Sequence, residues 1–199
     1  MIKKLINLVI FVFIFALYFV TFLMIYDNFR ERKLKDMERD ALKVLEKKTK
    51  VTKQEEQTDE TFVTGYSYAN FTVLGKLEIP SVGVNTVILK EHSHAAMNVG
   101  VIKTYGVELN EEGGFILSGH NFRGSSVFLY NIKNLVEGNK IYITDVNGMK
   151  MEYTVYSVQR YVDPTDTSFY KDFDGYHVVI STCENGGKTR IVVMARVDG

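Results

Sequence analysis

The stretch that decides the fold runs from residue 177 to residue 193 and has the sequence His-Val-Val-Ile-Ser-Thr-Cys-Glu-Asn-Gly-Gly-Lys-Thr-Arg-Ile-Val-Val. Two runs rich in β-branched residues, His177 to Cys183 and Thr189 to Val193, flank a short segment that contains Asn185 and two glycines. Such runs on either side of a glycine-rich segment predict a β-hairpin.

The register of this hairpin depends on its turn. A two-residue turn at Gly186-Gly187 pairs residue 183 with residue 190, so Cys183 lies opposite Arg190 with their Cβ atoms about 5 Å apart. A turn at Asn185-Gly186 instead places Lys188 opposite the cysteine. The first register brings a guanidinium beside a thiol, where it favours the thiolate or stabilises an oxyanion.

Cys183 is the only cysteine in the 199-residue chain, so no intrachain disulfide is possible. An unpaired thiol outside the membrane is an oxidation liability unless it is buried and inert or kept for chemistry. With an arginine and histidines available, the pattern predicts a nucleophile.

Three of the four histidines are poor candidates for the base that activates this thiol. His177 lies six residues before Cys183 on the same predicted strand, which places it about 20 Å away. His92 and His94 form a pair in a predicted loop and lack the further ligands of a zinc site, so we interpret them as loop residues.

His120 is the remaining histidine and a candidate for the base, although a histidine of this kind, taken alone, is more often structural than catalytic. It follows the apolar run Phe115-Ile116-Leu117 and lies between Gly119 and Asn121. The end of a strand that opens into a loop is a common place for catalytic groups.

The rest of the C-terminal part predicts a mainly β domain in the form of a compact barrel or sandwich. One helical stretch is expected at Ser125 to Leu135, where Phe128, Ile132 and Leu135 share a face. Eight short strands are expected, at Val73 to Ile79, Thr86 to Leu89, Gly100 to Lys103, Gly114 to Ser118, Lys140 to Asp145, Lys150 to Arg160, His177 to Cys183 and Thr189 to Val197.

The N-terminal part predicts a membrane anchor. Leu5 to Tyr26 contains 22 residues without charge, Gly or Pro, and as a helix it spans about 33 Å, enough to cross a bilayer. Basic residues flank it on both sides, so orientation is inferred from the short N-terminal stub, expected inside, and the large domain, expected outside. The expected organisation is a cytoplasmic stub at 1–4, a transmembrane anchor at 5–26, a charged helical stalk and linker at 27–61, and a catalytic β-barrel domain at 62–199.

Residues 27–60 carry ten Lys or Arg and ten Asp or Glu, with apolar residues at helical spacing only at Leu34, Met37, Ala41, Val44 and Leu45. This pattern favours a solvated helical stalk, fading into a linker after Val51. The alternative is a helix that packs on the domain or pairs with another chain. Over the whole chain 24 basic residues balance 24 acidic ones, which argues against nucleic acid as a partner.

Together these motifs resemble the sortases, the membrane-anchored cysteine transpeptidases of Gram-positive bacteria. The segment Val179-Ile180-Ser181-Thr182-Cys183 with Arg190 resembles the family's Thr-Leu-x-Thr-Cys and following Arg, although Val179 replaces the first Thr and Ile180 replaces Leu. Ser118-Gly119-His120-Asn121 resembles the Gly-His-Asn form of the histidine motif. Weaker agreement comes from the segments at 75–80 and 135–141, and the resemblance covers about residues 72 to 197.

The resemblance implies an eight-stranded sortase-type β-barrel and a site without metal or other cofactor. It implies Cys183 as nucleophile, His120 as general acid and base, and Arg190 as the group that stabilises the substrate carbonyl oxygen. Substrate-binding roles are expected for residues next to these three, namely Ser181, Thr182, Asn121 and Glu184.

The implied partners are secreted proteins with a C-terminal Leu-Pro-x-Thr-Gly-like sorting signal and a peptidoglycan or lipid-linked precursor amine, met on the outer side of the cell membrane. The short distance from Pro164 to Cys183 and the lack of a lid-like N-terminal segment favour a class B-like or class D-like member. Two alternatives use the same residues: a pilin-polymerising sortase and a membrane-tethered cysteine peptidase that releases product to water. A tethered barrel that only binds a partner is the non-enzymatic alternative.

Overall fold

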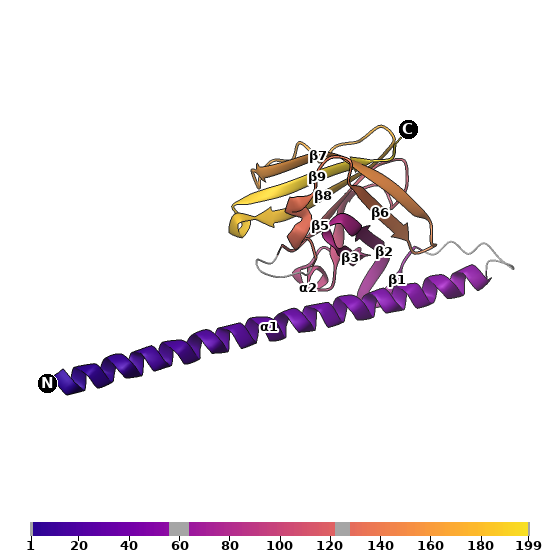
Figure 1. Cartoon of the computed structure of the whole chain (residues 1–199). Helices are drawn as coiled ribbons and strands as arrows, with labels where there is room; N and C mark the ends of the chain where they lie inside the picture. Colours follow the sequence, from indigo (N-terminus) through magenta and orange to yellow (C-terminus); the bar gives the residue numbers. More distant parts are fainter. Residues whose placement is uncertain (1, 56–63, 122–127, 199) are drawn as a thin grey trace.

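The computed structural model describes residues 2–55, 64–121 and 128–198. One long helix, α1 (Ile2–Glu55), passes beside a β-barrel, with about half of its length projecting beyond the barrel toward the N-terminus (Figure 1). The residues 56–61 of the expected linker lie outside the described residues.

Eight strands form a closed barrel, as predicted. Their order is β2-β3-β4-β5-β8-β9-β7-β6, and pairing between β2 and β6 closes the ring. A ninth strand, β1 (Tyr66–Tyr68), was not predicted and pairs with the start of β2. The barrel strands are β2 (Phe71–Ile79), β3 (Val84–Leu89), β4 (Val101–Gly106), β5 (Gly113–Gly119), β6 (Lys140–Asp145), β7 (Lys150–Val162), β8 (Tyr176–Glu184) and β9 (Thr189–Arg196).

The hairpin of β8 and β9 has the predicted register but a different turn. Pairing runs from His177 opposite Arg196 to Glu184 opposite Thr189. Asn185–Gly187 form a 3₁₀ turn in which all three residues have positive φ, 56° for Asn185, 69° for Gly186 and 87° for Gly187. Asn and Gly adopt this conformation at low cost, which explains the composition of the turn.

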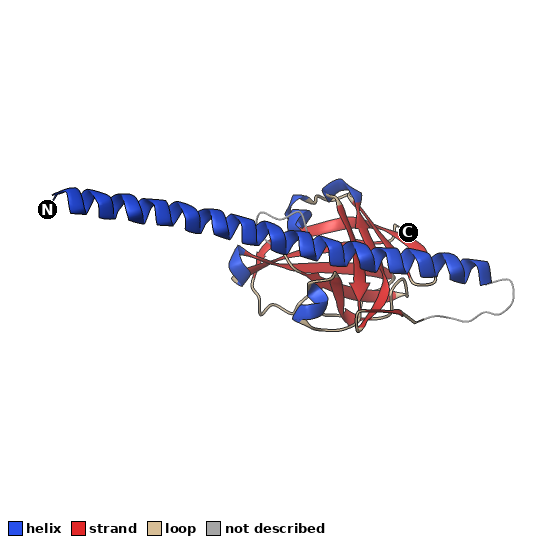
Figure 2. Cartoon of the chain, turned by 90° about the horizontal axis from the view of Figure 1, so that it is seen from below, coloured by secondary structure: helices blue, strands red, loops and turns tan. Residues whose placement is uncertain are grey.

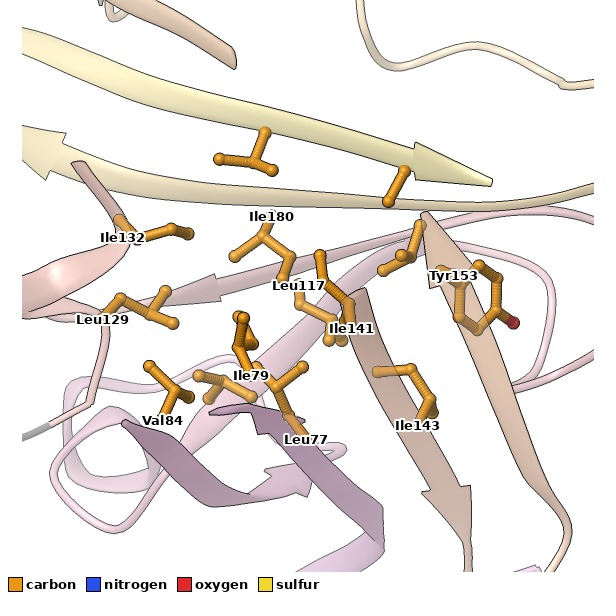
Figure 3. Close-up of a cluster of buried hydrophobic side chains, with 14 of the residues drawn as sticks. Leu77, Ile79, Val84, Leu117, Leu129, Ile132, Ile141, Ile143, Tyr153 and Ile180 are labelled. Carbon is orange, nitrogen blue, oxygen red and sulfur yellow. The ribbon is translucent and has the colours of Figure 1, made fainter. Parts of the chain in front are cut away.

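The barrel interior is filled by aliphatic side chains from nearly every strand (Figure 3). The described part of the expected helix at 125–135 is the 3₁₀ turn η2 (Tyr130–Asn134), which covers one end of the barrel. Phe128, Ile132 and Leu135 are all buried, as their shared face predicts. Residues 125–127 of the expected helix lie outside the described residues.

The charged segment of α1 packs on the barrel, contrary to the favoured prediction of a solvated stalk. Leu34, Ala41 and Leu45 are at most 8% exposed. Ala41 and Leu45 contact a cluster that includes Val87 and Leu89 of β3. The helix therefore covers the outer face of β3, and this explains why the strand is apolar on both faces from Val87 to Leu89. Figure 2 shows α1 running across the barrel.

The N-terminal part of α1 is apolar and exposed. The described side chains from Val9 to Tyr26 make no buried contacts with the barrel. By length and composition this is a helix able to cross a membrane, and it fits a single-pass membrane protein.

Candidate active site

Cys183 and Arg190 lie directly opposite each other in the β8–β9 ladder, as predicted. The cysteine side chain is exposed and forms no disulfide. Arg190 is also paired with Val162 of β7, so its backbone is held between two neighbouring strands. Directly opposed side chains project on the same face of the sheet, which places the guanidinium beside the thiol.

His120 is carried to the same end of the barrel by the parallel pair β5–β8. The register places Gly119 beside Thr182, and the next residues along the two strands are His120 and Cys183. The Thr182 hydroxyl donates a hydrogen bond of 2.7 Å to the Gly119 carbonyl. A Cβ atom on Gly119 would lie 2.9 Å from Val101, so only glycine permits this close packing.

Asn121 provides a second cross-strand bond at the site. Its Nδ2 donates to the Cys183 carbonyl at 2.9 Å. The residue after the base is therefore tied to the nucleophile's own backbone. This bond fixes the loop that follows β5 against the end of β8.

His94 lies against His120, which was not predicted. Instead of being a loop residue, His94 is the first residue of the short helix α2 (His94–Met97), capped by the Ser93 side chain. The two imidazole rings are stacked with centroids 5.7 Å apart and an angle of 26° between planes. His92, in contrast, lies in a loop as predicted, and its Nε2 contacts the Lys103 carbonyl at 2.6 Å.

Burial lowers the pKa of His120, and the nearby charges of His94 and of Arg30 on α1 lower it further. The imidazole is therefore kept neutral at neutral pH. Arg30 shows that the long helix reaches the environment of the predicted base. Sequence reasoning missed this neighbour because helical periodicity alone does not say where a helix packs.

Glu184 is held by two partners at the edge of the site. Its Oε1 accepts from the Arg160 guanidinium at 2.8 Å, and its Oε2 accepts from the Tyr161 backbone N–H at 3.3 Å. Tyr161 has φ of 60° and a side chain that is 65% exposed. The pairing of Glu184 holds the end of β7 next to the nucleophile strand.

Cys183 opens into a cavity of about 710 Å³ at this end of the barrel. It is lined by the nucleophile strand, its turn and the neighbouring loops, through Asn121, Tyr130, Lys133, Arg160, Tyr161, Cys183, Glu184 and Asn185 to Gly187. Of the four predicted substrate-binding residues, Asn121 and Glu184 line the cavity. Ser181 and Thr182 are 2% and 3% exposed, so their side chains lie beneath it.

His177 lies at the far end of β8, away from the cavity. Its ring stacks on Phe173 with centroids 4.7 Å apart and meets Tyr156 edge to face. This placement agrees with its exclusion as the base. Of the three histidines set aside in the sequence, only His94 is brought to the site.

The fold is a closed β-barrel that carries Cys183, His120 and Arg190 at one end. This combination defines a class of β-barrel proteins with a cysteine-centred site. Residues 77–198 match the family described as the sortase domain. They make up more than half of the chain, and the chain belongs to the sortase family.

Known relatives are similar over the same region. Sortase A of Listeria monocytogenes is 28% identical over 123 residues, which are 62% of this chain and 54% of that protein. Sortase A of Bacillus anthracis is 28% identical over 128 residues, 64% of this chain and 60% of that protein. The match thus spans little more than half the length of these relatives.

Solved structures give the same fold. Listeria monocytogenes sortase A superposes with a TM-score of 0.59 at 26% identity, covering 64% of this chain and 88% of that one. Clostridium perfringens sortase D5 superposes with a TM-score of 0.64 at 21% identity, covering 82% of this chain and 99% of that one. At that identity the second comparison concerns the fold alone.

Proposed function

We propose that this protein is a cysteine transpeptidase that cleaves a Leu-Pro-x-Thr-Gly-like sorting signal and transfers the cleaved protein to an amine of peptidoglycan or its lipid-linked precursor. The observation that carries the proposal is the pairing of Cys183 with Arg190 next to the strand that delivers His120. Membership of the sortase family supports the reaction class.

The first half-reaction forms a thioester. The Cys183 thiol transfers its proton to the neutral imidazole of His120 as the sulfur attacks the Thr carbonyl carbon of the signal, and the C–S bond forms as the C–N bond to Gly breaks. His120 donates a proton to the leaving amine. The oxyanion that develops on the carbonyl is stabilised by the Arg190 guanidinium.

The second half-reaction transfers the acyl group. An incoming amine attacks the thioester, a new C–N bond forms, and the C–S bond breaks to return the thiolate. His120 accepts the proton that the amine loses and returns it to the Cys183 sulfur, which restores the starting state. The neutral imidazole favoured by its surroundings is the form that accepts this proton.

We place the catalytic domain outside the cell, with the N-terminus in the cytoplasm. The apolar part of α1 supplies the single span, and secreted substrates and cell-wall amines are found on the outer side. Arg30, Arg32, Lys33 and Lys35 after the span do not oppose this orientation, since large domains cross largely regardless of flanking charge.

Mass spectrometry of the full chain in detergent tests the proposal. Incubation with a sorting-signal peptide is expected to add the N-terminal half of the peptide to Cys183 and to release the glycine-containing half. An added amine is expected to convert the adduct into a ligated product. An adduct on another residue, or no adduct in a folded protein, would contradict the proposal.

A peptidase that transfers the acyl group to water is the second candidate, because Cys183 is exposed to solvent. The amine dependence of the same assay separates the two. Product release that does not change with amine concentration, with no ligated product, would favour the peptidase.

A further inference from the structure

The barrel is held close to the end of the apolar segment by an unbroken helix. α1 is helical throughout the seven residues between Tyr26, the last residue of that segment, and Leu34, the first buried contact with the barrel. The rise of an α-helix makes the distance from Tyr26 to Leu34 about 12 Å along the axis. The headgroup region on one side of a bilayer is about 5–8 Å thick, so the first buried contact with the barrel lies only a few ångströms outside it.

The end of the barrel that faces the apolar segment is the end that carries the active site. Arg30, four residues after Tyr26, acts on the charge of His120. Leu34 packs with Phe128 at the start of the segment that covers this end of the barrel. In Figure 1 the turn between β8 and β9 and the end of β7 lie at the left end of the barrel, on the side to which the N-terminal half of α1 projects.

The edge of the cavity has side chains that suit a lipid headgroup layer. Tyr161 projects outward from a left-handed backbone conformation, which is costly for a tyrosine. The Arg160 guanidinium lies 5.3 Å from its ring centroid and is also ion-paired with Glu184, and the Lys133 ammonium lies 4.5 Å from the ring centroid of Tyr130. Tyrosines and basic residues are enriched where proteins meet the bilayer surface. The proposed chemistry uses none of these rings.

We infer that the mouth of the active site, formed by Lys133, Arg160, Tyr161 and the turn Asn185–Gly187, docks on the surface of the membrane that holds α1. Its partner is the headgroup layer of anionic lipids. The inference rests on α1 spanning the membrane and does not depend on the proposed chemistry. Residues 27–36 carry four basic and three acidic side chains, so their net charge is small. The physical link through α1 therefore contributes more to docking than the attraction between this segment and anionic lipids does.

Docking would restrict the reaction to substrates tethered to the same membrane. When the mouth of the active site lies at the headgroup layer, a substrate can bind only if its scissile peptide bond lies a few residues from the membrane surface. A sorting signal anchored nearby meets Cys183 at high effective concentration. Soluble peptides reach the same thiol only by diffusion along the surface or from the side.

Tryptophan fluorescence in vesicles tests the inference, because the chain has no tryptophan. The full chain with Tyr161→Trp is reconstituted in phosphatidylcholine and phosphatidylglycerol vesicles that contain a headgroup spin-labelled lipid. The matched control is Met149→Trp, at a side chain that is 52% exposed just before the other end of β7. The two positions are separated by about 40 Å of strand.

We expect strong quenching of tryptophan at 161 and little at 149. Seven polar helix-forming residues inserted after Tyr26 raise the barrel by about 10 Å and keep nearly the same helix face, and quenching at 161 is then expected to fall to the control level. Equal quenching at both positions, or quenching that the insertion does not change, would overturn the inference. Adduct formation on Cys183 with a soluble peptide, measured on the same samples, reports the proposed function separately.

Discussion

The rings of His94 and His120 stack with centroids 5.7 Å apart, so the predicted base has a second imidazole as its neighbour. Two imidazoles in contact disfavour the state in which both are charged. Together with burial and Arg30, this neighbour lowers the pKa of His120. Two elements outside the barrel strands, α2 and α1, therefore add to the effect of burial on the proton affinity of the predicted base.

Replacing His94 with Gln is expected to raise the pKa of His120, because the substitution removes a neighbouring positive charge while retaining a polar side chain. NMR titration of the imidazole in the full chain measures the pKa directly, and the pH dependence of kcat/KM gives a second readout. His92→Gln is the matched control, since its ring contacts the Lys103 carbonyl instead. An unchanged or lower pKa in His94→Gln would contradict the assignment.

Replacing His120 with Ala is expected to reduce kcat/KM by at least about 100-fold, through loss of the general acid and base. His177→Ala is the comparison variant. Its ring packs on Phe173 and Tyr156, so it is expected to lower stability and leave the rate of the folded protein nearly unchanged. Equal rate losses in two folded variants would remove His120 from its role.

Replacing Arg190 with Lys separates charge from geometry at the position opposite Cys183. A lysine preserves the positive charge but lacks the planar fork of donors that clamps an oxyanion. We expect a loss of about 3 kcal/mol in transition-state stabilisation, seen mainly in kcat. Near wild-type kcat would leave Arg190 as a source of charge only.

Glu38 makes the contact between α1 and the barrel sensitive to pH. Burial against β3 raises the pKa of Glu38 from 4.5 to about 7, although Thr86 and Lys35 partly oppose this. The folded state therefore holds a proton between pH 4.5 and 7 that the unfolded state has released.

The sign of the effect follows from that proton. The contribution of protonated Glu38 to stability is fully present below pH 4.5 and is lost as the pH rises through about 7. Glu38→Gln is expected to increase the free energy of unfolding at pH 8 by on the order of 1–3 kcal/mol and to have little effect near pH 4.5. Chemical denaturation of the full chain in detergent at both pH values measures this. A variant less stable than the parent at pH 8 would contradict it.

Local patterns in the sequence predicted the barrel and the central pair of the site. Short runs of β-type residues between turn residues located all eight barrel strands, and counting across the glycine turn paired Cys183 with Arg190. The 3₁₀ turn preserves this register even though its conformation differs from a two-residue turn. The three-residue strand β1 is too short to give a periodic pattern.

Contacts between distant segments were not predictable from the same patterns. The packing of α1 depends on the outer face of β3, and Val87 and Leu89 do not reveal in the sequence which element covers them. His94 was noticed only as half of a histidine pair, and its approach to His120 requires the path of the chain between β3 and β5. Such neighbours follow from tertiary structure, not from spacing.

The continuity of α1 makes membrane thickness relevant to the enzyme. Leu5 to Tyr26 span about 33 Å as a helix, slightly more than a typical hydrocarbon core of about 30 Å, and a helix relieves such a mismatch by tilting. This segment continues as one unbroken helix into the part of α1 that packs against β3. In the proposed membrane orientation, a thinner bilayer therefore tilts the whole barrel together with its anchor, and lipid composition alters the angle at which Cys183 meets its proposed substrate.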